Sequence, residues 1–342
     1  MTEPIAIHIV TGFLGVGKTS LINRLLRAPE LKDTLVIVNE WGEIGLDHLL
    51  YEKIADDVIL MPSGCLCCDL RGDLLDCLHD VLRRRDSGEL APFARIVLET
   101  SGLADPAPIL HALFSDPGLA ERTRMVGITT LVDAVNGFAT LQSHGEARRQ
   151  VALADRIVLT KSDLAPLSAP LRAALSAINP TAPIVNHAAD AFGAREFLAE
   201  PLAPAPPGRA SAMSAHGASV RSKSFSTERP IEAAALGQFL DLLNATLGPN
   251  LLRIKGLVGT RESPDQPLLI QGAQHVFHRP TRLAAWPSAK RETVLVVISD
   301  GLASEAVERL WRALTGVPEL DRPDLAAMTD NPLAPRAGGL LS

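Results

Sequence analysis

The sequence predicts an α/β fold with a mostly parallel sheet, followed by a smaller α+β domain. Over residues 1–199, short apolar segments alternate with amphipathic segments of helical periodicity. Residues 200–219 interrupt this alternation with a stretch rich in Pro, Ala and Ser, and residues 220–315 then return to strands with few helices. Alternation of strands and helices is typical of parallel sheets, whereas runs of strands with few helices are typical of α+β domains.

The predicted strands of the first domain are short, rich in valine and isoleucine, and apolar at nearly every position. A strand that helices bury on both faces has this pattern, because neither face meets water. These strands are residues 5–10, 34–39, 57–61, 94–99, 125–133, 156–160 and 182–186.

A helix is expected over residues 73–85, where Leu74, Leu78, Val81 and Leu82 form one apolar stripe. Arginines fill its last turn, where the helix dipole favours positive charge.

The second domain is predicted to hold five strands and two helices in residues 220–315. Residues 200–219 have no periodicity and are interpreted as a linker, and residues 316–342 as a flexible tail. The expected strands are 220–227, 251–259, 267–273, 274–278 and 293–299, and the expected helices are 230–248 and 303–314.

Composition and charge argue against several classes of protein. The chain has 342 residues, 46% of them hydrophobic, and a net charge of −6 from 33 basic and 39 acidic residues. This charge argues against nucleic-acid binding, which usually requires a basic domain or stripe. No apolar run is long enough to span a bilayer, and the N-terminal residues lack the basic start of a secretory signal. We therefore expect a cytoplasmic protein that binds neither nucleic acid nor membrane.

A phosphate-binding loop follows the first strand. In "TGFLGVGKTS", Gly12, Gly17, Lys18 and Thr19 fit G-x-x-x-x-G-K-[ST]. Glycines allow backbone N–H groups to surround phosphates, the lysine reaches the β and γ oxygens, and the threonine hydroxyl ligates Mg²⁺. A buried strand before the motif and an amphipathic helix after it make a chance glycine-rich turn a poor alternative.

A segment at the end of a predicted strand adds to the expected nucleotide site. Glu99 ends a strand in "VLETSG", where a carboxylate holds Mg²⁺ through water, and Gly102 supplies an N–H near the γ-phosphate. Most such proteins have aspartate in this role, so Glu99 is a departure; a polar strand end is the alternative interpretation.

The segment "TKSD" at 160–163 resembles the guanine-reading N-K-x-D element of GTPases. Asp163 would accept from guanine N1–H and its 2-amino group, and Lys161 would lie along the base. Thr160 replaces the usual asparagine, so one base contact is weakened or lost. The candidate nucleotide-binding residues are Gly12, Gly15, Gly17, Lys18, Thr19, Ser20, Gly102, Lys161 and Asp163.

Three of the four cysteines, Cys65, Cys67 and Cys68, stand in "SGCLCCDL". Thiols of a cytosolic protein stay reduced, and adjacent cysteines would form a strained disulfide, so the cluster indicates metal or catalysis. Thiolates suit Zn²⁺, Cu(I) and similar ions. Burial as three small apolar residues is the alternative. Cys77, on the apolar side of the 73–85 helix, is interpreted as a packing residue.

In order along the chain, "TGFLGVGKTS", "VNEWGEIGLD", "GCLCCDLRGDL", "ETSGLADP" and "LTKSDL" resemble the CobW-type branch of P-loop GTPases, which acts in metal homeostasis. Segments "LLRIKGLV", "LLIQGAQHVFH" and "TVLVVIS" resemble the C-terminal domain of that family. The resemblance spans roughly residues 4–315. It implies a P-loop NTPase fold and a GTP-driven metallochaperone or insertase for zinc, or for cobalt in one group.

The resemblance also implies the roles of individual residues. Cys65, Cys67 and Cys68 match the C-x-C-C metal motif of the family, and tetrahedral zinc needs a fourth donor, for which Glu40, Glu43 or water are candidates. Asp47 would belong to the switch segment and position Mg²⁺ or water. The expected catalytic residues are Lys18, Glu99 and Asp47, and the expected cofactors are GTP or GDP, Mg²⁺, and Zn²⁺ or Co²⁺.

Three functions compete at this point. The preferred one is slow GTP hydrolysis that drives metal delivery to a client metalloprotein; no arginine finger or glutamine equivalent stands beside the switch motifs. A GTP-dependent metal sensor that delivers nothing is the second, and a small-molecule kinase, which "TKSD" opposes, is the third. The client and the metal stay open, as does a homodimer that depends on metal or nucleotide.

Overall fold

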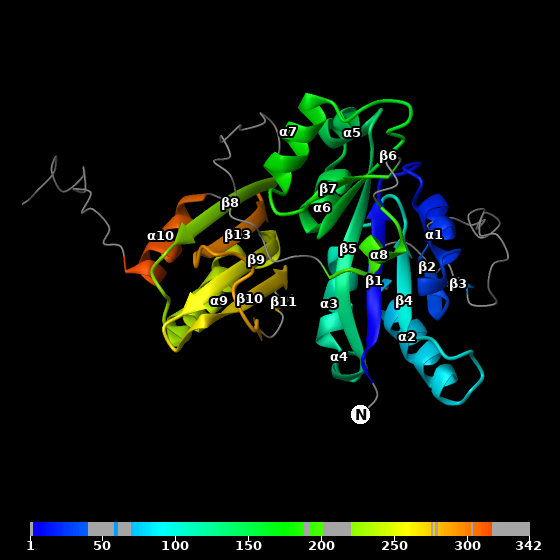
Figure 1. Cartoon of the computed structure of the whole chain (residues 1–342), viewed down its shortest axis with the longest axis horizontal. Coiled ribbons are helices and arrows are strands. Elements are labelled where there is room, and N and C mark those ends of the chain that lie inside the picture. Colours follow the sequence, from blue (N-terminus) through cyan, green and yellow to red (C-terminus); the bar gives the residue numbers. More distant parts are fainter. Residues whose placement is uncertain are drawn as a thin grey trace, which may run out of the picture.

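The computed structural model describes residues 3–39, 58–60, 70–187, 192–200, 220–274, 276–277, 280–301 and 304–316. Figure 1 shows two domains side by side, each built around one sheet. In this described part of the chain, no helix has the length and apolar character needed to cross a membrane.

The first domain holds a seven-stranded sheet in the order β3-β2-β4-β1-β5-β6-β7. Each neighbouring pair is parallel, which confirms the predicted parallel sheet. The strands are β1 Ile5–Gly12, β2 Thr34–Asn39, β3 Val58–Leu60, β4 Arg95–Thr100, β5 Thr123–Asp133, β6 Arg156–Thr160 and β7 Ile184–Asn186.

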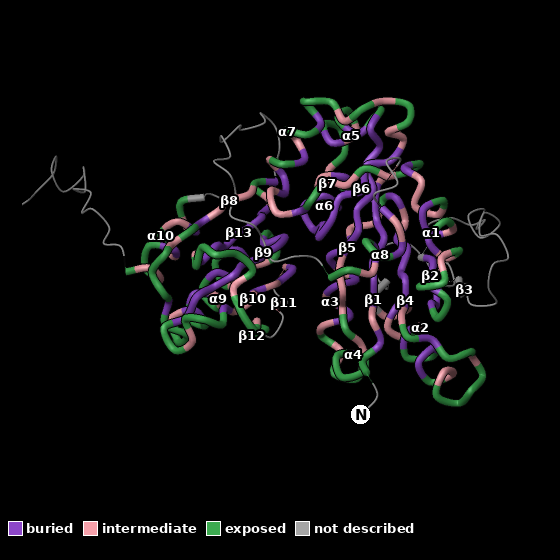
Figure 2. The backbone as a smooth tube through the Cα atoms, in the orientation of Figure 1, coloured by how far each residue is buried: buried purple, intermediate pink, exposed green. Residues whose placement is uncertain are grey.

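Helices cover both faces of this sheet, and its central strands β1, β4 and β6 are buried at nearly every position (Figure 2). On β1, Ile7 and Ile9 pack with residues of α2 and α3, whereas Val10 packs with residues of α1 and α8 on the opposite face. This alternation explains why the strands are apolar at consecutive positions. The helices are α1 Lys18–Leu26, α2 Leu70–Asp86, α3 Ala107–Ser115, α4 Pro117–Arg122, α5 Gly137–Ser143, α6 Gly145–Leu153, α7 Ala169–Ile178 and α8 Ala194–Leu198, with a 3-10 helix at Pro29–Leu31.

The second domain holds a six-stranded sheet in the order β11-β10-β9-β13-β8, with β12 paired to β10. Its strand pairs are antiparallel. The elements are β8 Val220–Thr227, α9 Ala233–Leu247, a 3-10 helix Gly248–Asn250, β9 Leu251–Thr260, β10 Ser263–Ala273, β11 Val276–Phe277, β12 Thr281–Arg282, β13 Thr293–Asp300 and α10 Ser304–Thr315.

Several details of this domain differ from the sequence expectation. The helix expected from residue 230 begins at Ala233, because Ile231 forms a bridge with Thr260 instead. Strand β10 begins at Ser263, four residues early, since its pairing with β9 resumes beyond an irregular register. The short β12 was not predicted, because it gains its strand conformation only from pairing with β10.

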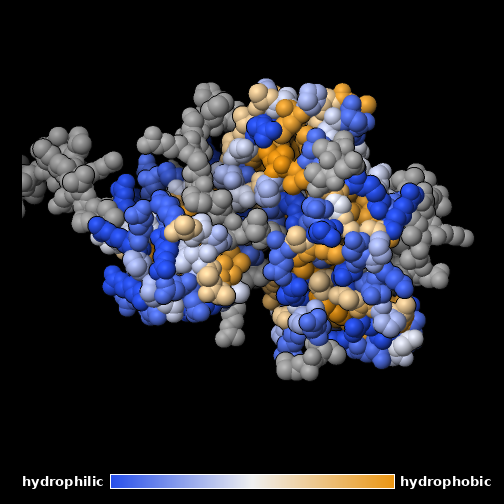
Figure 3. All heavy atoms as spheres, viewed as in Figure 1, coloured by the Kyte–Doolittle hydropathy of each residue, from blue (hydrophilic) through white to orange (hydrophobic). Residues whose placement is uncertain are grey.

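The antiparallel sheet is covered by helices on one face and by the first domain on the other. Leu295 and Val297 of β13 pack with α9 and α10, whereas Val294, Val296 and Ile298 pack with α5–α7 of the first domain. The visible surface of the second domain is mostly hydrophilic in Figure 3, and apolar side chains gather instead on the first domain near α6 and α7. The two domains therefore share a continuous apolar core.

Candidate active site

Glycines shape the loop of residues 13–17, which joins β1 to α1. A Cβ on Gly12 would lie 2.5 Å from the carbonyl oxygen of Leu131, so no side chain fits there. Gly15 and Gly17 have φ angles of 68° and 90°, a left-handed conformation that glycine adopts without steric cost. Gly17 caps α1 without a side chain. The N-terminus of α1 is therefore a ready site for a phosphate.

Lys18 begins α1 and turns back over this loop. Its Nζ donates to the carbonyl oxygens of Gly12 at 3.0 Å and Phe13 at 3.3 Å. The ammonium group thus lies beside the backbone that would surround a phosphate chain. Ser20, two residues further along α1, is exposed.

Thr19 and Glu99 meet where β1 and β4 end. Thr19 Oγ1 donates to Glu99 Oε1 at 2.9 Å, and Glu99 is only 3% exposed. The neighbouring strands bring them together, since Val10 of β1 is in register with Glu99 of β4. A hydroxyl and a carboxylate are the oxygen donors that Mg²⁺ prefers, so this pair fits the expected magnesium site.

Gly102 lies against the phosphate loop. A Cβ at this position would lie 2.7 Å from the backbone nitrogen of Leu14, so only glycine allows this approach. Thr100 Oγ1 also donates to Thr11 Oγ1 at 2.7 Å, which ties the end of β4 to the end of β1. Residues 101–106, which we call the sensor loop, therefore begin in contact with the residues expected to bind phosphate.

Lys161 follows β6 with a left-handed backbone, φ 54°. Its Nζ donates to Asp133 Oδ2 at 2.7 Å, across the ends of β6 and β5. Burial opposes ionisation of Asp133, but hydrogen bonds from Lys161 and from the N–H groups of Val135 and Asn136 outweigh it and hold the pKa of the carboxyl below its ordinary value. The Lys161 stem is thus held by an ionised partner.

Asp163 is exposed at the same edge, beside the end of β7. The hydroxyl of Ser162 donates to Asn186 Oδ1, and the backbone N–H of His187 donates to Leu159 O at 2.9 Å. The loop with "TKSD" and the end of β7 therefore form one surface beside the phosphate loop.

These residues gather because the strands are parallel. All the described candidates lie at or just after strand ends at the carboxyl edge of the first sheet, which is where open α/β sheets bind ligands. The predicted nucleotide residues from Gly12 to Asp163 are thus brought to one edge. Six other predicted site residues lie outside the described residues: Glu40, Glu43, Asp47, Cys65, Cys67 and Cys68.

Family profiles match both domains of the chain. Residues 6–186 match the family described as CobW/HypB/UreG, nucleotide-binding domain. Residues 220–315 match the cobalamin synthesis protein cobW C-terminal domain. The chain belongs to the CobW family. The resemblance inferred from the motifs, to a CobW-type P-loop GTPase, is confirmed.

Two similar proteins, both named as zinc chaperones, match the chain over different shares of their length. The zinc chaperone YjiA of Escherichia coli strain K12 is 31% identical over 322 residues, covering 91% of this chain and 99% of that protein. The zinc chaperone CobW of a Sinorhizobium species is 32% identical over 184 residues, covering 46% of this CobW-family chain and 50% of the relative.

Solved structures extend the likeness to both domains. The crystal structure of Zn(II)-bound YjiA GTPase from E. coli has a TM-score of 0.68 and 26% identity, covering 92% of this chain and 99% of that one. A YjiA triple variant, with one glutamate and two cysteines replaced by alanine, is likewise Zn(II)-bound and matches with the same TM-score of 0.68.

Sequence reasoning missed three residues of this CobW-family site: Asp133, Asn186 and Gln150. Asp133 and Asn186 end strands beside Lys161 and Ser162, and their position at strand ends was a usable signal. Gln150 is 1% exposed on α6, and its amide nitrogen donates to the carbonyl oxygens of Gly102 at 3.1 Å and Ala104 at 3.0 Å. A glutamine on an otherwise apolar helix face was its only signal.

No group of three or more His, Cys, Asp or Glu residues capable of holding a metal ion occurs in the described ranges. Cys77 on α2 is a free, half-buried thiol that packs against the core, as its helical position predicted. Burial, and then nearby Asp80, raise the pKa of this thiol. Cys77 therefore makes a poor metal ligand.

Proposed function

We propose that this CobW-family GTPase is a metallochaperone that carries Zn²⁺ as cargo on Cys65, Cys67 and Cys68 and delivers it to a client metalloprotein. The observation that carries the nucleotide half of the proposal is the 2.9 Å hydrogen bond between Thr19 and Glu99, beside the phosphate loop. The zinc half rests on the three clustered thiols and on the relatives that are named zinc chaperones.

For hydrolysis, each described residue would have a distinct task. The phosphate loop and the N-terminus of α1 would hold the β- and γ-phosphates, and Lys18 would neutralise charge that builds on them. Thr19 and Glu99 would hold Mg²⁺, which supplies Lewis-acid stabilisation of the phosphate oxygens when bound. Gly102 would direct its N–H toward the γ-phosphate, and Asp47 would position Mg²⁺ or water.

For base selection, Asp163 would accept from guanine N1–H and from its 2-amino group. Adenine has no donor at N1 and no 2-amino group, so it would leave this carboxylate without partners. Thr160, which replaces the usual asparagine, is buried, and its hydroxyl donates to Val132 O at 3.3 Å. Selection of guanine would therefore depend mainly on Asp163, with Lys161 packed along the base.

For the cargo, two or three thiolates would bind Zn²⁺, and Glu40, Glu43 or water would complete a tetrahedral set. The "NEWGEIGLD" segment with these glutamates stands between the phosphate loop and the cysteines in the chain. If it orders around the γ-phosphate, zinc affinity depends on the nucleotide, by about 5- to 150-fold for a typical coupling. The coupling by itself does not fix its direction; we propose tighter zinc binding with GTP and release after hydrolysis. The cytoplasm keeps the thiols reduced.

The test is a competition titration of Zn²⁺ against a chelator, with GDP and with a non-hydrolysable GTP analogue. The triple variant Cys65→Ser, Cys67→Ser, Cys68→Ser should lose the tightest site, and Cys77→Ser is the matched control that should keep it. Because a YjiA variant without two of its cysteines still binds zinc, weaker residual binding is expected. Unchanged tight binding in the triple variant would place the cargo elsewhere.

Titration with Co²⁺ in the same assay separates the two candidate metals. A chaperone should also transfer its metal to an apo-metalloprotein faster with GTP than with GDP. A metal sensor would show nucleotide-dependent affinity without accelerated transfer, and that result would favour the second candidate function.

A further inference from the structure

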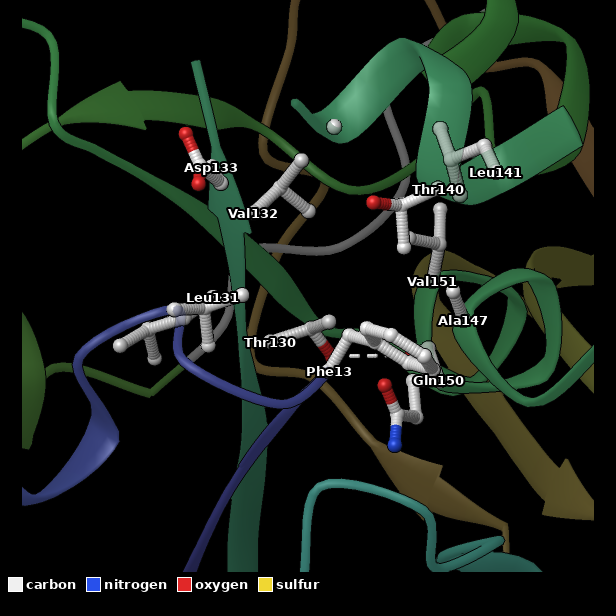
Figure 4. Close-up of a pocket in the computed structure, with 12 residues that line it drawn as sticks. Phe13, Thr130, Leu131, Val132, Asp133, Thr140, Leu141, Ala147, Gln150 and Val151 are labelled. Atoms are coloured by element: carbon white, nitrogen blue, oxygen red, sulfur yellow. Dashed lines mark hydrogen bonds between the residues drawn. The ribbon is translucent and has the colours of Figure 1, made fainter. Parts of the chain in front are cut away.

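Helix α6 is hydrogen-bonded to the sensor loop, residues 101–106. The side-chain amide of Gln150 donates to the carbonyls of Gly102 and Ala104. The backbone carbonyl of Gln150 accepts from Thr130 Oγ1 at 2.9 Å, the contact dashed in Figure 4. Gln150 is therefore fixed on β5 by its backbone and on the loop by its side chain. Since two carbonyls of the loop are bound, rotation of the peptide units around Gly102 is restricted.

The oxygen of the same side-chain amide differs from its nitrogen. Gln150 Oε1 is buried and has no hydrogen-bond partner among the described residues. A buried acceptor without a partner is unfavourable. A rearranged sensor loop that turns an N–H toward Gln150 would satisfy this oxygen.

Arg149, the preceding residue, contacts the sensor loop and the second domain together. Its Nη1 lies 3.5 Å from Asp105 Oδ2 in the loop, and its Nη2 donates to Asp300 Oδ2 at 2.9 Å, at the end of β13. Asp105 Oδ1 also accepts from the N–H of Ala107 at 2.9 Å, at the start of α3. One guanidinium group therefore joins the loop and the second domain.

Helix α6 is itself fixed to the second domain immediately afterwards. Arg253 of β9 donates to Leu153 O at 2.9 Å and pairs with Asp155, and Lys255 also pairs with Asp155 at 2.9 Å. All three charged side chains are less than 10% exposed, with values of 7%, 8% and 2%. Separating a buried charge from its partner is strongly unfavourable, so α6 and β9 should move together.

We infer that Gln150 and Arg149 are positioning residues that link the sensor loop to the placement of the second domain. The inference rests on the proposed function in one respect, that Gly102 responds to the γ-phosphate. A change in the sensor loop alters its contacts with Gln150 and Arg149. Helix α6 then transmits this change to the sheet of the second domain. Because coupling between two sites acts in both directions, this link predicts that a change at Asp300 alters the preference for GTP over GDP.

The first experiment replaces Asp300 by asparagine and measures the affinities for GDP and for a non-hydrolysable GTP analogue. The ratio of the two affinities should change by about two- to fivefold, the range for one partly exposed ion pair. Asp265→Asn is the matched control, since Asp265 forms an ion pair with Arg291 within the second domain, and its ratio should equal that of the wild type. An unchanged ratio in Asp300→Asn overturns the link.

The second experiment separates positioning from folding. Gln150→Met keeps the volume of the side chain but loses both donors, so single-turnover GTP hydrolysis should slow about tenfold while GDP affinity is retained. Equal losses of GDP affinity and rate would indicate only structural damage. In the double variant Arg149→Gln, Asp300→Asn, the change in the affinity ratio should equal that of Arg149→Gln alone, and additive changes would contradict a shared contact.

The same measurements distinguish this inference from the proposed function. If Lys18→Ala leaves GTP hydrolysis intact, the nucleotide site itself is wrongly assigned. If Lys18→Ala abolishes hydrolysis while Asp300→Asn and Gln150→Met behave as the wild type, the proposed function stands and only the link through α6 fails.

Discussion

The two ends of the candidate nucleotide site are built in different ways. The phosphate end uses mostly backbone from one continuous segment, where Gly12, Gly15 and Gly17 adopt conformations or contacts that other residues resist. The base end uses side chains from three strands, with Lys161 held by Asp133 and Ser162 held by Asn186. The comparison teaches that the proposed phosphate binding would depend on local conformation, whereas the proposed base selection would depend on tertiary contacts that single substitutions can adjust.

The largest effect is expected at the phosphate end, from Lys18→Ala. Removing the ammonium that lies over the loop should slow GTP hydrolysis at least about 100-fold, the usual loss for one group that stabilises transition-state charge. The unmodified protein should itself be slow, on the order of 10⁻⁴ to 10⁻² per second. Single-turnover kinetics measures both rates.

Lys32→Ala is the matched control, because Lys32 is exposed after the 3-10 helix and should keep the normal rate. Turnover of several per second in the unmodified protein, without metal or partner, would contradict the expectation of slow hydrolysis.

An intermediate effect is expected at the base end, from Asp163→Asn. Guanine loses its paired acceptor, so the preference for GDP over ADP should fall about 10- to 100-fold, as when a buried polar group of a ligand is left unpaired. Equilibrium titration with labelled GDP and ADP measures this ratio. Asp241→Asn, an exposed position on α9, should leave it unchanged. Equal affinity of the unmodified protein for ADP and GDP would refute the guanine assignment.

The smallest effect is expected from Asp133→Asn, which removes the ionised partner of Lys161. GDP affinity should fall by about three- to tenfold, the scale of one ordinary net hydrogen bond, because the Lys161 side chain is partly exposed. The pKa of Asp133 lies below its ordinary value, so the pair persists at neutral pH and is lost only as pH falls through that lowered pKa. GDP affinity in the unmodified protein should thus show no loss from this pair between pH 8 and pH 5. A loss of GDP affinity between pH 8 and pH 5 that is absent in Asp133→Asn would show that the pKa of Asp133 is not lowered.

Much of the fold and part of the site could be predicted because the relevant signals are local. Consecutive apolar residues in β1, β2 and β4 reflect burial on both faces, which follows from a parallel sheet between two helix layers. Asp133 and Asn186 were missed because their roles exist only across neighbouring strand ends. Strand β12 was missed because its two residues are exposed and form a strand only through their partner.

By itself, the sequence determined the parallel sheet, the phosphate loop, the family and the clustering of the cysteines. These features depend on periodicity, on glycine conformations and on residues within a few positions of each other. Only the tertiary structure decided that Glu99 meets Thr19, that Asp133 holds Lys161, and that Arg149 joins the sensor loop to Asp300. Such contacts join residues 28 to 151 positions apart, and their geometry depends on strand order and domain packing, which no local pattern encodes.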